Sequence, residues 1–230
     1  MYNSRALILA GGFGLRLRPL TISLPKPLLP VDGHAVIEHI LEQLDLPQID
    51  DIYVSTGYMG RYVRCFVESH IGRNCKFLEE TTPLGTAGPL GLLPESGAPC
   101  VVWNGDVLAK LNVCDILNYH RAQDADATVL CIDRTEESQY GTIEITNGRV
   151  STWIEKPRYD RTIAGGIYVL SSQVCKLAQG DSRMDMPDLI SQAIQLGLKV
   201  LPYKYGGSWT DIGSLETYDD LVRCSSVGVK

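Results

Sequence analysis

Short apolar runs alternate with amphipathic stretches along the first half of the chain. Runs such as Ala6–Ala10 and Pro99–Trp103 have the length of buried strands, whereas Ala35–Leu44 places its apolar residues at helical spacing. By the same criteria, strands are predicted at Asp51–Thr56, Cys75–Leu78 and Ala127–Ile132, and helices at Arg61–Ser69, Thr86–Leu93 and Val113–Arg121. Strands that alternate with helices predict βαβ units and a mostly parallel sheet.

The pattern changes after Asp133 and becomes richer in strands. Three segments are strand-like and two are helical: Tyr140–Ile145, Arg149–Ile154 and Ile163–Leu170, then Met186–Leu196 and Ser214–Arg223. The dipeptide Asn147-Gly148 predicts a tight hairpin turn between the first two strands. No Ser- or Pro-rich linker and no internal repeat divides the chain. We therefore predict one continuous domain over residues 1–230, with halves of about 1–133 and 134–230.

Composition narrows the class of protein. The 230 residues are 44% hydrophobic and 21% charged, with a net charge of −6, which is typical of a globular protein and argues against a nucleic-acid partner. The seven cysteines are odd in number and form no C-x-x-C motif, which favours reduced thiols. No signal peptide and no apolar stretch of membrane-spanning length is visible. A cytoplasmic location without a membrane partner is the expectation.

The segment from Ala10 to Pro30 carries the clearest chemical signal. Three glycines, Gly11, Gly12 and Gly14, follow the first apolar run, and Arg16 and Lys26 come after them without any acidic residue. Glycines let backbone N–H groups approach an anion, and basic side chains neutralise it. The segment is neither a Walker A loop nor a dinucleotide fingerprint. It predicts a site for a nucleoside triphosphate; the alternative is an ordinary strand-to-helix turn.

Two carboxylates stand where a metal ligand is expected. Asp106 follows the strand Pro99–Trp103 in the sequence Asn-Gly-Asp, and Asp211 precedes the last predicted helix. Ligands of open α/β sheets bind beyond the carboxyl ends of the strands, and Mg²⁺ prefers oxygen ligands. The alternatives are a turn residue at Asp106 and a helix N-cap at Asp211. Sequence spacing leaves open whether the two side chains converge.

Other glycine-rich and charged motifs complete the set of candidates. The turn Pro83–Pro89 leads into a short helix and would let backbone approach a flat ring. Glu155-Lys156 either forms a surface pair or binds sugar hydroxyls and a phosphate. Gly165-Gly166 permits the close approach of a ligand or marks a β-bulge.

Taken in order, these motifs resemble a known family. The series GGxGxRLxPLT, PKPLLPV, PLGTAGP, NGD, EKP, GGIYV and WxDIG is similar to the sugar-1-phosphate nucleotidyltransferases, and the resemblance runs from Arg5 to about Leu221. These enzymes include mannose-1-phosphate guanylyltransferases and glucose-1-phosphate thymidylyl- and uridylyltransferases. The resemblance implies an α/β, Rossmann-like three-layer fold with a mixed, mostly parallel central sheet. It also implies Mg²⁺-dependent transfer of a nucleotidyl group to a sugar phosphate, with release of pyrophosphate.

The resemblance also implies roles for individual residues. Residues 1–133 would bind the nucleotide and residues 134–230 the sugar. Arg16, Lys26 and Asp106 would be catalytic, and Asp106 and Asp211 would hold Mg²⁺. The nucleotide would contact Ala10, Gly11, Gly12, Gly14, Glu80, Pro83, Gly85 and Thr86. The sugar would contact Asn104, Gly141, Glu155, Lys156 and Gly166.

Two residues depart from the family pattern. Leu15 stands where a hydroxyl residue usually precedes Arg16, and Ala164 stands where an Asn usually binds a sugar hydroxyl. The motif PLGTAGP is closest to that of guanylyltransferases for mannose-type sugars. The length of the chain resembles those acting on D-glycero-D-manno-heptose 1-phosphate, precursors of capsule or surface polysaccharide. GTP and this heptose phosphate are therefore the expected substrates.

Base selection is assigned to Glu80. The alternatives are that Glu80 is merely a solvated residue at the end of a strand, or that Glu79 plays this part. A carboxylate can accept both adjacent donors of guanine, whereas an amide suits a pyrimidine. A uridylyl- or cytidylyltransferase for another hexose 1-phosphate, and a catalytically silent regulatory subunit, stay as alternative functions. A homodimer is left open.

Overall fold

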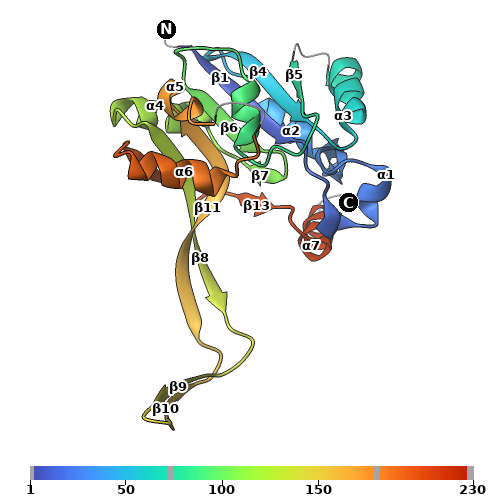
Figure 1. Ribbon diagram of the computed structural model, residues 1–230. Coiled ribbons are helices and arrows are strands. Elements are labelled where there is room, and N and C mark those ends of the chain that lie inside the picture. Colours follow the sequence, from blue (N-terminus) through green and yellow to red (C-terminus); the bar gives the residue numbers. More distant parts are fainter. Residues whose placement is uncertain (1–2, 72–74, 179–181, 227–230) are drawn as a thin grey trace.

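The protein, described here by a computed structural model, is built on one seven-stranded sheet (Figure 1). The structure describes residues 3–71, 75–178 and 182–226. The strand order is β12-β8-β11-β6-β1-β4-β5. These strands are β1 (Ser4–Ala10), β4 (Ile49–Thr56), β5 (Lys76–Glu79), β6 (Cys100–Asn104), β8 (Ala127–Glu137), β11 (Arg158–Leu170) and β12 (Val200–Lys204). Only β11 runs antiparallel to its neighbours, β6 and β8, so the predicted mixed, mostly parallel sheet is confirmed.

Helices cover both faces of this sheet. They are α1 (Leu20–Ser23), α2 (Val36–Gln43), α3 (Gly60–Phe66), α4 (Val113–Ala122), α5 (Ser172–Cys175), α6 (Met186–Gln195) and α7 (Leu215–Ser226). Alternate residues of β1 enter different clusters: Ile8 packs with α2 and α4, and Leu7 packs with α5 and α6. Period-two alternation along a strand buried on both faces produces this division. The three-layer α/β fold expected from the sequence is thus observed.

Short elements connect the layers. The chain forms 3₁₀ helices at Leu15–Leu17, Lys26–Leu28 and Gly88–Leu92, and a π-helical turn at Val67–Ile71. Three pairs of short strands lie outside the main sheet: β2 (Pro30–Val31) with β3 (His34–Ala35), β7 (Val107–Ala109) with β13 (Trp209–Asp211), and β9 (Thr142–Thr146) with β10 (Arg149–Ile154). The helix predicted at Thr86–Leu93 is therefore a shorter 3₁₀ helix, since two glycines and a proline weaken it. In the described part of the chain, no helix is long and apolar enough to cross a membrane.

Two strands of the sheet continue beyond it as a projecting arm, defined here as residues 133–162. The outer parts of β8 and β11 pair with each other, and the hairpin β9–β10 forms the tip (Figure 1). The pairing of β11 with β8 shifts between Ala164 and Tyr168, so Gly165-Gly166 forms a bulge where the arm leaves the body. Gly166 has a φ of +72°, which only glycine adopts readily. Both strands extend further than the predicted Ala127–Ile132 and Ile163–Leu170.

Candidate active site

A large cavity lies at the carboxyl edge of the sheet. Its volume is about 600 Å³, and it opens where β1, β4, β5 and β6 end. Parallel strands that end at one edge leave a crevice there for ligands. Twelve of the predicted site residues line it: Ala10, Gly11, Gly12, Gly14, Arg16, Lys26, Glu80, Pro83, Gly85, Thr86, Asn104 and Asp106.

The glycine-rich loop forms one wall of this cavity. A Cβ at Gly11 would lie 2.3 Å from Oε1 of Glu80, so a side chain there would displace that carboxylate. Gly14 has a φ of +60°, and its carbonyl accepts a hydrogen bond of 2.8 Å from the buried Thr21 hydroxyl. Arg16, two residues after Gly14, lines the cavity. The loop is thus more than a plain turn, because it presents both backbone and a cation to the cavity.

Lys26 and Asp106 form an ion pair in the cavity. The side chains are 13% and 28% exposed, and the ammonium donates to Asp106 Oδ2. Pro25 and Pro27 flank Lys26 and are both buried, so the backbone that carries the ammonium is fixed. Asp106 is therefore a paired side chain of the site rather than a turn residue alone.

Asp211 joins this pair through the strands β7 and β13. Their antiparallel pairing sets Asp211 opposite Val107, and Ile212 N donates to Asp106 O at 2.9 Å. The structure thus brings together two carboxylates that are 105 positions apart in the sequence. The N-cap alternative fails, because Ser214 Oγ accepts from Thr217 N at 3.2 Å and caps α7 instead.

Asp211 is a largely buried carboxylate in a charged environment. Its Oδ1 is buried and has no hydrogen-bond partner among the described residues. Burial raises the pKa of the Asp211 carboxyl, and the charge of Asp106 raises it further. Lys26, Arg16 and Arg134 act in the opposite direction on this pKa. A cation bound between the two carboxylates would relieve both the repulsion and the missing partner.

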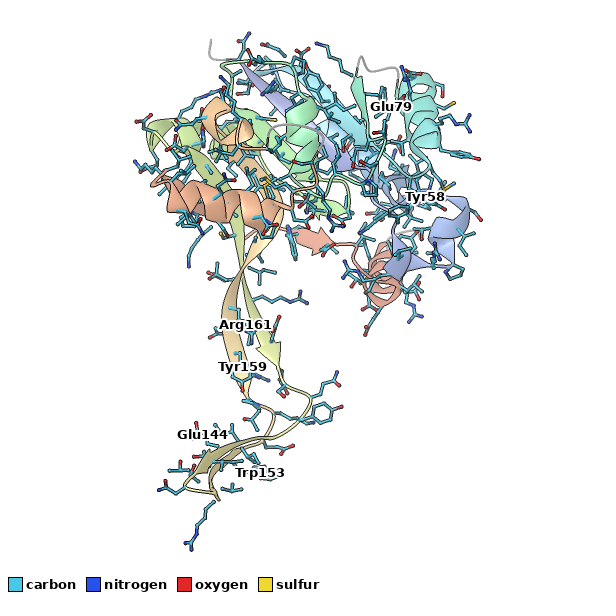
Figure 2. All side chains as sticks on the ribbon, viewed as in Figure 1. Tyr58, Glu79, Glu144, Trp153, Tyr159 and Arg161 are labelled. Atoms are coloured by element: carbon cyan, nitrogen blue, oxygen red, sulfur yellow. The ribbon has the colours of Figure 1, made fainter. Side chains whose placement is uncertain are left out.

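Glu80 is held in place at the opposite wall. Its Oε1 accepts a 2.9 Å hydrogen bond from the buried Ser55 hydroxyl, and its Oε2 accepts from Leu84 N at 3.2 Å. The alternative residue Glu79 points elsewhere and pairs with Arg64 at 3.1 Å, beside α3 (Figure 2). Of the two, only Glu80 faces the cavity, so the interpretation of Glu80 as a merely solvated strand end does not hold.

The second glycine-rich turn fastens α6 to the cavity wall. Gly85 has a φ of +79°, and a Cβ there would lie 2.5 Å from Met184 O. Thr86 N donates to Asp185 Oδ1 at 3.2 Å, and Thr86 Oγ1 accepts from Met186 N at 2.7 Å. Gly85 and Thr86 therefore have a structural task as well as a place in the lining.

The structure divides the predicted sugar residues between two places. Asn104 lines the cavity with a buried Oδ1 that has no hydrogen-bond partner in the described chain, and Gly166 lies so close that a Cβ would be 2.8 Å from Asn104 Nδ2. Gly141, Glu155 and Lys156 lie on the arm instead, outside the cavity lining. The arm brings two of these together, because a Cβ at Gly141 would lie 2.8 Å from Glu155 Oε2. Within one chain the two groups do not meet.

Four residues near the site were missed by sequence reasoning. Ser55 and Phe13 line the cavity, as does Arg183, which pairs with Asp185 at 3.4 Å. Arg134 lies at the root of the arm and acts on the Asp211 carboxyl. Ser55 alone carried a sequence signal, namely a hydroxyl near the end of an apolar strand.

The family described as nucleotidyl transferase matches residues 5–224. The chain belongs to the nucleotidyl transferase family. This assignment confirms the resemblance seen in the motifs.

Curated relatives in this family are named for a guanylyl transfer. The chain is 34% identical over 229 residues to mannose-1-phosphate guanylyltransferase 1 of Arabidopsis thaliana, covering 93% of this chain and 62% of the relative. It is 31% identical over 220 residues to the catalytic subunit beta of the Dictyostelium discoideum enzyme, covering 91% of this chain and 61% of that protein. The chain thus spans less than two thirds of the length of these curated relatives.

Solved structures share the whole architecture. A Bacillus anthracis protein assigned as a glucose-1-phosphate thymidylyltransferase, in complex with a sucrose, has a TM-score of 0.76 at 25% identity and covers 96% of this chain and 95% of its own. HddC from Yersinia pseudotuberculosis complexed with GMP-PN has a TM-score of 0.71 at 24% identity, covering 97% and 99% of the two chains, which shows a shared fold. The predicted fold class is confirmed by these neighbours.

Proposed function

We propose that this chain transfers a nucleotidyl group, GMP from GTP, to a mannose-type sugar 1-phosphate and releases pyrophosphate. The observation that carries the proposal is the junction of Lys26, Asp106 and Asp211 beside a basic, glycine-lined cavity. A cavity of about 600 Å³ has the size of ordinary small-ligand sites. The family and the names of the curated relatives support the reaction class.

The chemistry follows from the charges in the cavity. An oxygen of the sugar phosphate attacks the α-phosphorus of the nucleotide, and the bond from that phosphorus to the bridging oxygen breaks. Pyrophosphate departs with the electron pair. The attacking phosphate is already ionised, so no general base is needed. The chain must orient two anions and offset their repulsion, which Lys26 does at the reacting phosphate and Arg16 at the departing pyrophosphate.

The two carboxylates fit a divalent cation, proposed here as Mg²⁺. In the described ranges no cluster of three or more His, Cys, Asp or Glu side chains could hold a metal ion, so Asp106 and Asp211 would supply two ligands only. Mg²⁺ is commonly held by one or two carboxylates together with substrate phosphates. The unpartnered Asp211 Oδ1 agrees with that donor set. When bound, the ion would neutralise charge on the phosphates.

Guanine is the proposed base because of Glu80. Its two oxygens already accept from Ser55 and Leu84, and each retains acceptor capacity toward the cavity. Guanine N1–H and N2–H₂ would donate to them side by side. The names of the curated relatives agree with this base.

The sugar is proposed as mannose-type, with D-glycero-α-D-manno-heptose 1-phosphate as the specific candidate for surface polysaccharide synthesis. Asn104 and Gly166 offer one acceptor and room beside it in the cavity. Ala164 is exposed near this point and supplies no amide, so a hydroxyl read by an Asn in other members of the family would be read differently here.

A substrate matrix tests the proposal. The purified chain is assayed for pyrophosphate release with each of GTP, UTP, CTP and ATP against mannose, glucose and manno-heptose 1-phosphates, with and without Mg²⁺. We expect release with GTP and a mannose-type phosphate only when Mg²⁺ is present, and loss of release in Asp106→Asn. Preference for UTP or CTP would replace guanylyl transfer with one of the alternatives. NTP binding without release for any pair would identify a silent subunit.

A further inference from the structure

The tip of the arm exposes an ordered apolar face. In the hairpin, Ile145 stands opposite Val150 and Ile143 opposite Trp153, and the register shift between Val150 and Thr152 keeps both pairs on one face. The polar face carries Glu144 and Thr152, which hydrogen-bond at 2.9 Å. The large apolar side chains of the arm are exposed to an unusual extent: Tyr140 77%, Trp153 68%, Ile145 66%, Val150 58%, Ile154 47%, Ile143 46% and Tyr159 43%. Figure 2 labels Trp153 at the tip and Tyr159 along the arm.

This face needs a partner surface. Within the described chain, β9 and β10 pack on each other and make no extended contact with another element. An isolated two-stranded hairpin is marginal in water, and a contiguous exposed apolar patch marks an interaction site. At about 3.3 Å per residue, the outer strands and the hairpin reach roughly 30 Å beyond the sheet. The arm is therefore long enough to lie on a second molecule.

The same chain presents a second exposed apolar surface, at the rim of the cavity, where Phe13 packs against Tyr58 with ring centroids 5.4 Å apart. Phe13, Leu15, Leu20 and Ile22 are 46%, 60%, 38% and 59% exposed, and the first two also line the cavity. The arm projects away from this rim, which lies around α1 (Figure 1). Two apolar surfaces that cannot meet within one chain can meet between two copies.

The charged groups of the arm differ in their partners, and Glu155 accepts a 3.3 Å hydrogen bond from Trp153 Nε1. Arg158 pairs with Glu137 at 2.9 Å and Arg161 with Glu136 at 3.7 Å, whereas no described residue forms an ion pair with Lys156. Lys156 has a φ of +45°, a costly conformation for a residue with a side chain and one that clusters at functional sites. The cavity, in turn, holds Asn104 but lacks Glu155 and Lys156.

We propose that two copies of this chain exchange arms, so that each hairpin covers the cavity rim of the other copy and places Glu155 and Lys156 at its sugar side. A two-fold axis lets both exchanges form at once and closes the assembly. The charged groups of the arm then complete a cavity that one chain leaves open. Their task at the sugar phosphate rests on the proposed function, whereas the exchange itself rests on the apolar surfaces.

The first test measures mass in solution and needs no activity. Light scattering of the wild-type chain should give a dimer, and the variant Ile145→Ser/Trp153→Ser should give a monomer. The matched control Ile194→Ser/Leu196→Ser removes two equally exposed apolar side chains from α6 and its end, and should stay dimeric. Circular dichroism confirms folding of each variant. A wild-type monomer, or a dimer that survives loss of the hairpin face, would overturn the exchange.

The second test is complementation between two inactive variants. Lys26→Met removes a body residue and Lys156→Met an arm residue, so each homodimer should be at least tenfold impaired. After mixing and re-pairing, half of the molecules are mixed dimers with one intact cavity, which restores about one quarter of wild-type activity. No recovery would show that each arm contributes to the cavity of its own chain. Full activity of Lys156→Met would show that the arm does not contribute Lys156 to the site. If the wild type releases no pyrophosphate with any substrate pair, the proposed function fails, while light scattering still decides the exchange.

Discussion

Lys26 and Lys156 are both assigned to a phosphate, yet the protein surrounds them in opposite ways. Lys26 is 13% exposed, sits between two buried prolines and is paired with Asp106. Lys156 is exposed on the arm, without an ion pair among the described residues and on a left-handed backbone. In the body, the fold fixes the position of the Lys26 ammonium before any ligand binds. In the arm, no described residue forms an ion pair that would fix the Lys156 ammonium.

The same contrast appears in the tryptophans. Trp103 is fully buried and donates to Val107 O at 2.8 Å, whereas Trp153 is 68% exposed. Burial of a large aromatic side chain stabilises a body that folds alone. Trp153 contributes far less within one chain, because most of its ring stays in water and its Nε1 donates only to the nearby Glu155, at 3.3 Å. The four predictions below test whether the body is preorganised as this contrast implies.

The largest effect is expected at Asp211. Asp211→Asn keeps the shape and removes one negative charge, so we expect turnover to fall about a hundredfold or more, on the scale of losing a key electrostatic element. Thermal stabilisation by Mg²⁺ with nucleotide should also fall. Asp220→Asn, an exposed carboxylate on α7, is the control. Near wild-type turnover of Asp211→Asn at saturating Mg²⁺ would remove Asp211 from the metal site.

Lys26→Met should reduce kcat by about a hundredfold while changing KM little. The methionine keeps the stem and loses the charge that stabilises the transition state. Steady-state kinetics with both substrates measure the split, and Lys176→Met, an exposed lysine at the end of α5, is the control. A raised KM with unchanged kcat would mean that Lys26 serves binding alone.

Glu80→Gln should shift base preference from GTP toward UTP. Loss of a charge-assisted pair that reads a base is worth about 1–3 kcal/mol, which is roughly a 5- to 150-fold change in the ratio of kcat/KM values. Glu79→Gln is a neighbouring control, because its carboxylate pairs with Arg64 outside the cavity. An unchanged ratio in Glu80→Gln, or a shift of equal size in Glu79→Gln, would contradict the assignment.

The smallest effect concerns His120, buried in the body. Its ring Nδ1 lies 2.9 Å from Thr128 Oγ1, and burial, followed by the charge of Arg121, lowers its pKa below the usual 6.5. The unfolded chain therefore gains protons first as the pH falls, so the free energy of unfolding should decrease below about pH 6.5. Urea unfolding at pH 7.5, 6.5 and 5.5 measures this decrease, and His120→Gln should flatten it. The arm, residues 133–162, contains no histidine and should contribute nothing in this range. An unaltered slope in His120→Gln would contradict the interpretation.

Much of the body could be predicted because its signals are local. Apolar runs such as Ala6–Ala10 are buried on both faces, so hydrophobicity alone marks them as strands. The glycines and basic residues of the first loop, and Asp106, follow directly from such strands. Twelve predicted site residues share one cavity because the carboxyl ends of parallel strands lie at one edge.

The hairpin of the arm was predicted, because β9 and β10 match the strands expected on either side of Asn147-Gly148. The stem of the arm, formed by the outer parts of β8 and β11, escaped prediction for the opposite reason. The outer residues of β8, Asp133 to Glu137, are exposed and polar, so no burial pattern marks them as a strand. Backbone pairing with β11 holds them, and that pairing is invisible in the side-chain sequence. The short strands β7 and β13 were missed as well, although their pairing delivers Asp211 to Asp106.

The sequence alone determined the fold class, the glycine-rich loop and the identity of the candidate groups, because burial periodicity and glycine positions can be recognised from neighbouring residues. The tertiary structure decided which groups meet. Pairing between β7 and β13 joined Asp106 to Asp211, and hydrogen bonds from Ser55 and Leu84 separated the task of Glu80 from that of Glu79. The bulge at Gly165-Gly166 carried Glu155 and Lys156 away from the cavity. Contacts between distant segments arise from strand register and backbone bends, which no local pattern encodes.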